Sequence, residues 1–163
     1  MHIRSVLFVL IAAFTVVSAS GATDVVVRTS SGQPEVRAVL FRADWCANCR
    51  VLEPVLAQAV AKATHLPVQH ISLDFTNAQT WDHAIELALD HDIVTTYNAY
   101  AGTTGLVVLV AADTGERIDC INRLYTVDAM VAAFDKAVKR TRTSPPGSRD
   151  VGSVVCPPSR MAP

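Results

Sequence analysis

Strand-like and helix-like patterns alternate along the chain from residue 23 to about residue 140, and this alternation constrains the fold more than any other feature. Strand-like runs lie at residues 24–28, 36–42, 68–74, 106–111 and 116–124, and helical periodicity marks residues 46–63, 81–91 and 127–138. The order of these elements predicts an α/β domain with a mixed central sheet and helices on both of its faces.

Side chains suited to helix capping mark where two of these helices begin. Thr80 can cap the second helix, and Thr126 or Asp128 can cap the last one. The segment 92–105, between the second helix and the next strand, is long for a connection. From residue 141 the composition shifts to Ser, Pro, Gly and Arg, so residues 141–163 are predicted to form an irregular and poorly packed tail.

Residues 1–22 have the layout of a secretory signal peptide. A basic start precedes an apolar run, Val6–Val17, and a stretch of small residues with candidate cleavage sites after Ala19 and Ala22. The alternative is a retained membrane anchor, but the run has about 12 residues and a spanning helix needs about 20. We therefore expect an exported protein, periplasmic or secreted after cleavage, with its folded domain over residues 23–140.

The charges of the chain are nearly balanced, with 14 Lys and Arg residues against 15 Asp and Glu residues and a formal net charge of −1. Because binding to nucleic acid is driven by cationic surfaces that displace counterions, we do not expect a nucleic-acid partner. Asp82, Glu86 and Asp90 recur at every fourth position and are interpreted as a solvated acidic helix face.

A Cys-x-x-Cys motif connects the strand at 36–42 to the helix that follows it. Cys46 falls in the first helical turn, where unpaired N–H groups and the positive end of the helix dipole favour a thiolate, so it is the expected nucleophile. Cys49 lies three residues further on the same face and can displace a mixed disulfide formed at Cys46. Trp45 would shield the pair and offer a flat apolar surface to a peptide.

This Trp-Cys-x-x-Cys motif, with Pro54 five residues after Cys49, resembles the thioredoxin superfamily, and the element order matches that family over roughly residues 24–140. The lead-in Ala-Asp-Trp-Cys is similar to periplasmic thioredoxin-fold modules, including the C-terminal domain of the transmembrane thiol reductant carrier. The resemblance implies a thioredoxin-like fold and a thiol–disulfide oxidoreductase that acts on protein thiols and disulfides, uses Cys46 and Cys49, and needs no bound cofactor. Pro54 lacks an N–H, so we expect the helix to bend there.

The chain departs from the family at the loop opposite the cysteines. Thioredoxins place a cis-proline there, but no proline occurs between Pro67 and Pro145. The residue opposite the motif is predicted to be Leu106, Gly105 or Tyr97. Because a cis bond without proline costs about 2.5–4 kcal/mol, we expect that bond to be trans.

A second departure concerns the proton acceptor near Cys49. Leu40 stands six residues before the first cysteine, where many thioredoxins have a buried aspartate. His70, in the strand at 68–74, could act as the base instead, because histidine titrates near pH 6.5. The alternative is an ordinary, partly buried strand histidine.

Cys120 and Cys156 remain after the motif is set aside. In an oxidising compartment they would most simply pair and tie the tail to the domain, a staple worth about 3.8 kcal/mol on the chain-entropy model. Two alternatives stay open. Cys120 could be a free buried thiol while Cys156 pairs with another chain, or Cys156 could be a second redox group on a mobile tail.

Other interpretations of the motif also stay open. The fold could bind Cu(I), zinc or a partner through Cys46 and Cys49 without turnover, although a closed structural zinc site needs four ligands and no second Cys or Cys-His pair has usable spacing. We therefore predict no metal site. A redox domain that serves one membrane partner is a further possibility. A monomer is expected, and the direction of electron flow stays open.

Overall fold

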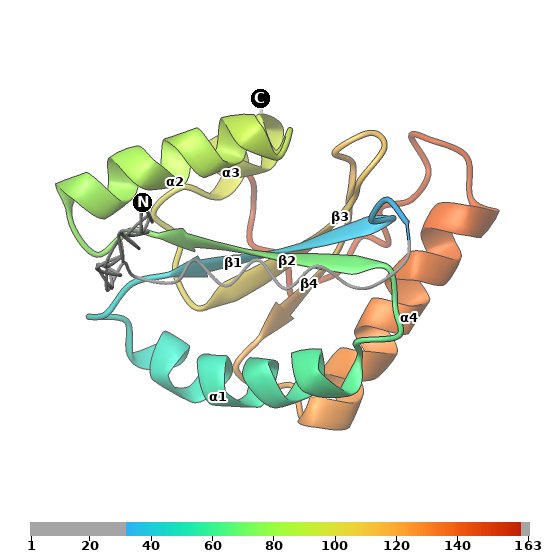
Figure 1. Cartoon of the computed structure of the whole chain (residues 1–163), viewed down its shortest axis with the longest axis horizontal. Helices are drawn as coiled ribbons and strands as arrows, with labels where there is room; N and C mark the ends of the chain where they lie inside the picture. Colours follow the sequence, from blue (N-terminus) through green and yellow to red (C-terminus); the bar gives the residue numbers. More distant parts are fainter. Residues whose placement is uncertain (1–31, 161–163) are drawn as a thin grey trace, which may run out of the picture.

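The computed structural model describes residues 32–160 (Figure 1). The predicted signal peptide, with its cleavage sites, and the predicted strand at residues 24–28 lie outside the described residues. Over the described part of the chain, no helix combines the length and the hydropathy that crossing a membrane requires.

A four-stranded mixed sheet forms the middle layer, with the strand order β2-β1-β3-β4. Strand β1 is parallel to β2 and antiparallel to β3, and β4 is antiparallel to β3. The strands are β1 (Val36–Arg42), β2 (Val68–Asp74), β3 (Leu106–Ala111) and β4 (Arg117–Asn122).

Helices cover both faces of this sheet, as Figure 1 shows: α2 and α3 lie on one face, and α1 and α4 on the other. The helices are α1 (Ala47–Lys62), α2 (Ala78–Asp90), α3 (Val94–Tyr100) and α4 (Val127–Thr143). The predicted α/β architecture, a mixed central sheet with helices on both faces, is confirmed.

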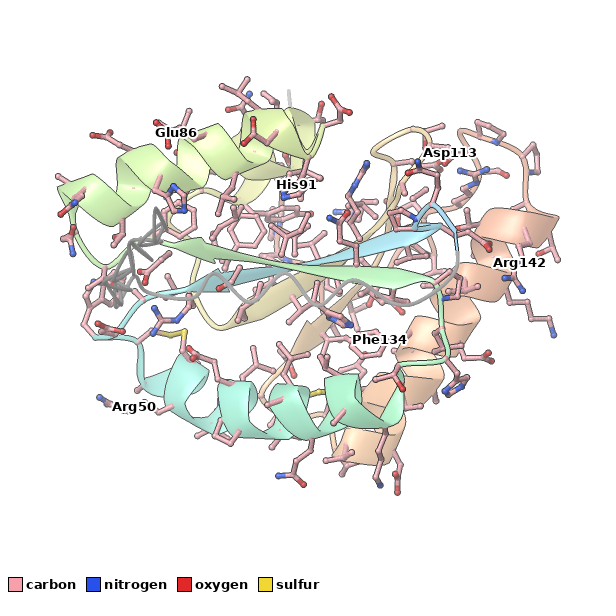
Figure 2. The ribbon with its side chains drawn as sticks, viewed as in Figure 1. Arg50, Glu86, His91, Asp113, Phe134 and Arg142 are labelled. Atoms are coloured by element: carbon pink, nitrogen blue, oxygen red, sulfur yellow. A yellow bond between two sulfur atoms is a disulfide. The ribbon has the colours of Figure 1, made fainter. Side chains whose placement is uncertain are left out.

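The apolar strands β1 and β3 take the two central places because both of their faces are buried. Successive side chains of a strand point to opposite faces. In β1, Ala38 and Leu40 therefore join the core beneath α1 and α4, whereas Val39 and Phe41 join the core beneath α2 and α3. Phe134 reaches the first of these cores from α4 (Figure 2).

Three helices differ from the prediction. Asn77, rather than Thr80, caps α2, and Thr80 is the third residue of a capping box in which each side chain receives the other's backbone N–H. The segment predicted as a long connection contains the short helix α3, whose side chains Thr96 and Tyr100 are buried. Thr126 caps α4, which continues past the expected end at residue 138 to Thr143.

The tail after α4 has irregular backbone, as predicted, but it is closely held to the domain, which differs from the poor packing that its composition indicated. Val151 donates its N–H to the carbonyl of Ile118 in β4 at 3.0 Å. The Glu116 carboxylate accepts the backbone N–H groups of Gly147 and Arg149 at 2.8 and 2.6 Å. The Arg149 side chain is only 4% exposed and pairs with Asp113. Specific polar contacts therefore order a segment with few apolar side chains.

Candidate active site

Cys46 is the N-cap residue of α1, at the junction that the sequence predicts. Its Sγ accepts the backbone N–H of Cys49 at 3.1 Å, in the manner of an oxygen-bearing N-cap side chain. A negative charge on this sulfur would face the unpaired N–H groups of the first turn and the positive end of the helix dipole. The position therefore stabilises a Cys46 thiolate more than a thiol.

Cys46 and Cys49 form a disulfide whose Cα atoms are 5.3 Å apart. Both residues are buried and pack with Ala43, the residue that follows the end of β1. The two sulfurs can therefore interconvert between a disulfide and a dithiol within one helical turn.

The loop before Cys46 is held by the segment that follows β2. Trp45 donates its indole N–H to the carbonyl of Thr76 at 3.3 Å, and Asp44 donates its backbone N–H to the Thr76 hydroxyl at 2.9 Å. The Trp45 side chain is nevertheless 60% exposed. A large apolar surface therefore stands in a fixed position directly beside the disulfide.

Arg42, the last residue of β1, gathers three carboxylates below this loop. It pairs with Asp74 across the sheet, with Asp44 at 2.5 Å and with Glu53 at 3.1 Å. Although burial alone would lower the pKa of Arg42, the hydrogen bonds to Asp44 and Glu53 raise it above its ordinary value. Arg42 is thus a permanent cation that links β1, β2 and α1 next to the cysteines.

Gly105 is the residue opposite the cysteines, among the three that the sequence offered. A side chain built at Gly105 would place its Cβ 3.5 Å from Cys46 Sγ, and the Gly105 N–H bonds the carbonyl of Phe41 at 2.8 Å. Leu106 begins β3 as a buried strand residue, and Tyr97 lies on α3. No cis peptide bond occurs among residues 32–160, so the predicted trans bond is confirmed.

The structure does not bring His70 to the cysteines. His70 pairs with Ala38 in the sheet, four residues before Asp74 and so about 13 Å along β2 from the strand end beside the motif. Its ring meets Phe134 edge to face at a centroid distance of 5.2 Å. Burial lowers the pKa of His70 to about 4, so the imidazole is neutral at pH 7. These contacts match the alternative of an ordinary strand histidine.

Leu40 lines a mostly apolar cavity of about 420 Å³ between α1 and β2, together with Glu53 and His70. Pro54 lies inside α1, which continues through it to Lys62, and the expected bend stays a prediction. Glu53, which pairs with Arg42 near the motif, was not identified from the sequence. Its spacing of four from Cys49 places both on one helix face, a signal that the sequence did contain.

Cys120 and Cys156 form the second disulfide, with their Cα atoms 5.1 Å apart. Cys120 is fully buried beneath α2 and α3, and Cys156 packs against the same core from the tail. The structure thus places this pair away from α1, as a covalent attachment of the tail. Within residues 32–160, no three His, Cys, Asp or Glu side chains gather as a metal site.

Comparison with known proteins gives matches among solved structures alone. No protein-family profile matches the chain. No curated protein matches it. Trxlp from Edwardsiella tarda EIB202 is 14% identical, with 66% of this chain and 85% of that chain covered and a TM-score of 0.41. A malarial protein is 13% identical, with 63% and 96% covered and a TM-score of 0.41. The first thioredoxin domain of mouse protein disulfide-isomerase A4 is 18% identical, with 69% and 70% covered and a TM-score of 0.41.

Proposed function

We propose that this protein is an exported thiol–disulfide oxidoreductase that exchanges disulfides with protein substrates through Cys46 and Cys49. The observation that carries the proposal is the position of the Cys46 sulfur as the N-cap of α1, bonded to the Cys49 N–H and covalently paired with Cys49. A structural disulfide across two residues would close too short a loop to stabilise the fold much. A redox role explains why the pair occupies the one place in α1 that favours a thiolate.

The exchange proceeds in two balanced steps. In the dithiol form, the Cys46 thiolate attacks one sulfur of a substrate disulfide, and the other substrate sulfur leaves as a thiolate and takes up a proton. Cys49 then loses its proton and attacks Cys46 Sγ, which closes the Cys46–Cys49 disulfide and releases the second substrate sulfur. The substrate gains two electrons and the protein loses two. The reverse sequence oxidises a substrate dithiol.

A protein substrate, rather than a small thiol alone, is supported by the surface beside the disulfide. Trp45 offers an exposed indole fixed by its bond to Thr76, and Gly105 presents backbone without a side chain next to Cys46 Sγ. The flat apolar surface of Trp45 suits contact with a polypeptide, and the missing side chain at Gly105 leaves room for the Cys46 sulfur. Membrane-bound redox partners would use the same surface.

An exported location is supported by the signal-peptide pattern of residues 1–22 and by the Cys120–Cys156 disulfide, since structural disulfides persist in oxidising compartments. Intact-mass analysis of the protein recovered from a secretory host tests it. The expected mass is that of a chain beginning after Ala19 or Ala22, with Cys120 and Cys156 joined. An uncleaved cytosolic chain would contradict the location.

Trapping tests the activity. A Cys49→Ser variant lacks the sulfur that resolves the mixed disulfide, so it should accumulate covalent complexes with substrate proteins through Cys46, and these should disappear on reduction. The matched control is Cys46→Ser, which should trap far less. If Cys49→Ser forms no mixed disulfide with proteins or with a small disulfide, the oxidoreductase proposal is wrong. Stoichiometric Cu(I) retained by the reduced protein would then favour the metal-binding alternative.

A further inference from the structure

The helix α2 buries two alanines and packs Leu87 against the core, but it leaves three large apolar side chains partly exposed. Ala84 and Ala88 are buried against the sheet, whereas Ile85 is 41% exposed and Leu89 is 60% exposed. Trp81, one turn before Ile85, is also partly exposed. An amphipathic helix that only covered a core would bury its largest apolar side chains. The row Trp81, Ile85 and Leu89, here called the outer row, is therefore available to another surface.

A row of carboxylates runs beside the outer row. Asp82, Glu86 and Asp90 each follow one residue after a member of the outer row, which places them about 100° further round the helix. Figure 2 shows Glu86 on the side of α2 away from the sheet. Like charges four residues apart destabilise a helix by about 0.2–0.5 kcal/mol per pair. Within α2, the Glu86 carboxylate lies 3.4 Å from the His83 ring nitrogen.

The sequence around α2 supplies no stronger cation. No Lys or Arg occurs between Ala63 and Glu116. Arg42, at the end of β1, is engaged by Asp44, Glu53 and Asp74. The surface of α2 is therefore both apolar and acidic, which complements a surface that is apolar and basic.

The outer row begins next to the redox site. Thr76, which fixes Trp45, directly precedes the N-cap residue Asn77 of α2. Trp81 packs edge to face on Phe75 at 4.8 Å and lies 3.2 Å from the position of a Cβ built on Gly102, in the loop that leads to Gly105. From there α2 runs for about 20 Å away from the cysteines (Figure 1). A chain lying on α2 could thus present its cysteine to Cys46.

The tail of the protein already places a cation at this surface. The Arg160 guanidinium nitrogens lie 3.6 and 3.7 Å from the Cβ position built on Gly102, beside the Trp81 ring. The Arg160 N–H bonds the carbonyl of Ala99 at 3.0 Å, which holds this arginine against α3. An arginine is thus accommodated where the outer row begins.

We propose that the outer row and its flanking carboxylates dock a basic, amphipathic segment of a substrate protein. The cysteines of that substrate exchange with Cys46 and Cys49. This inference rests on the proposed oxidoreductase function and specifies its substrates: polypeptides with apolar residues and Lys or Arg on one face, next to a cysteine. The apolar residues cover Trp81, Ile85 and Leu89. The cations neutralise Asp82, Glu86 and Asp90, which removes their mutual repulsion.

The test compares two synthetic helical peptides, each closed by one disulfide and identical except that the lysines of the first are glutamates in the second. The dithiol form of the full protein reduces each peptide, and kcat/KM is measured for each. Dividing this value by kcat/KM for a small aromatic disulfide corrects for changes in the chemistry at Cys46. The lysine peptide should be preferred about tenfold, and the preference should shrink at high ionic strength. The triple variant Asp82→Asn, Glu86→Gln, Asp90→Asn should lose the preference for the lysine peptide. The double variant Ile85→Ser, Leu89→Ser should raise KM for the lysine peptide.

Two matched controls separate this surface from general effects. Val154→Ser removes an exposed apolar side chain from the tail, and Asp135→Asn removes a carboxylate from α4, and neither should change the preference. Equal use of the two peptides by the wild-type protein, or an unchanged preference in the triple variant, would overturn the docking proposal. So would a dimer in sedimentation that the double variant dissociates, because a second copy would then cover α2. Failure to reduce even the small disulfide would instead refute the oxidoreductase function.

Discussion

Gly105 lies so close to Asn48 that a Cβ atom on Gly105 would come within 2.6 Å of the Asn48 Cβ. Cβ atoms cannot approach this closely, and the φ angle of Gly105 is +79°, a conformation that residues with side chains rarely adopt. Two independent constraints therefore require glycine at the position where the loop before β3 meets the dipeptide between the cysteines.

Replacing Gly105 with alanine should lower the free energy of unfolding by about 3 kcal/mol, because backbone strain and a steric clash add together. It should also slow disulfide exchange by moving the loop away from Cys46. Urea unfolding and the exchange rate with a small disulfide measure the two effects. The matched control is Gly115→Ala, where φ is +69° but the nearest atom would be 3.7 Å away.

The control should cost about 1 kcal/mol and leave exchange unchanged, so the difference between the two variants isolates the contact with Asn48. Adding Asn48→Gly to Gly105→Ala should restore part of the stability, because it removes the opposing Cβ. Equal destabilisation by the two alanine variants would show that the close approach has no energetic consequence.

Removing the Cys120–Cys156 disulfide should destabilise the protein by about 3–4 kcal/mol, since the two residues are 36 positions apart. The double variant Cys120→Ala, Cys156→Ala, compared with wild type by urea unfolding, measures this. Limited proteolysis should also begin to cut the tail. The control is Cys46→Ala, Cys49→Ala, whose separation of 3 predicts a loss about half as large or less. A larger loss in the control would contradict the assignment of the second disulfide as the staple.

The buried imidazole of His70 should make stability depend on pH. Its folded pKa of about 4 lies below the unfolded value near 6.5, so the unfolded chain binds the proton more tightly. The free energy of unfolding should therefore fall as the pH drops from about 6.5 to about 4, by up to about 3 kcal/mol. A His70→Phe variant keeps an aromatic contact with Phe134 and should lack this part of the pH dependence.

The comparison is the difference in free energy of unfolding between wild type and His70→Phe at each pH, because carboxylates contribute equally to both. His65→Gln, at an exposed position, is the matched control. The same variants also test whether His70 acts as the base near Cys49. His70→Phe should leave the pH profile of thiol exchange unchanged. A shifted profile would show that His70 assists the cysteines after all.

The buried Arg149 should contribute more to the free energy of unfolding than an exposed arginine that also pairs with a carboxylate. Its guanidinium pairs with Asp113 and donates to the carbonyl of Ser144 at 3.1 Å. Arg149→Met should cost about 2 kcal/mol and raise hydrogen exchange in the tail. Arg142→Met, which breaks the exposed pair with Glu35, should cost less than about 1 kcal/mol. Equal losses would contradict a specific role of Arg149 in ordering the tail.

The sequence was sufficient for three strands, predicted longer bounds for β4 than the observed Arg117–Asn122, and was insufficient for α3. Strands β1, β2 and β3 have the predicted bounds, because β1 and β3 are apolar runs that bury well in a sheet and β2 alternates apolar and polar residues. Helix α3 contains Val94, Thr95 and Thr96, whose branched side chains disfavour helices. What stabilises it is tertiary: Tyr100 is buried, and its hydroxyl accepts a hydrogen bond from Arg117 at 2.6 Å. That contact joins residues 17 positions apart, which no local pattern shows.

The candidate site was predictable where one short segment determines it. Cys46, Cys49 and Trp45 follow from a strand that runs directly into an amphipathic helix. Gly105 was one of three candidates for the residue opposite the cysteines. Which of the three lies there depends on how β3 pairs with β1, and spacing along the chain does not show this. The distance of His70 from the cysteines was not predictable, since the register of β2 with β1 sets it. Positions set by strand register cannot be derived from spacing along one element.

The alanines under α2 have a consequence for how a protein like this can diversify. Ala84 and Ala88 attach the helix to the sheet, and Trp81 packs on the core residue Phe75, whereas Ile85 and Leu89 are not part of the described core. The residues that fold the domain and the residues that would select its clients are thus separately encoded on one helix. New client preferences can arise by changing a few outer side chains, while the core and the chemistry at Cys46 are inherited intact.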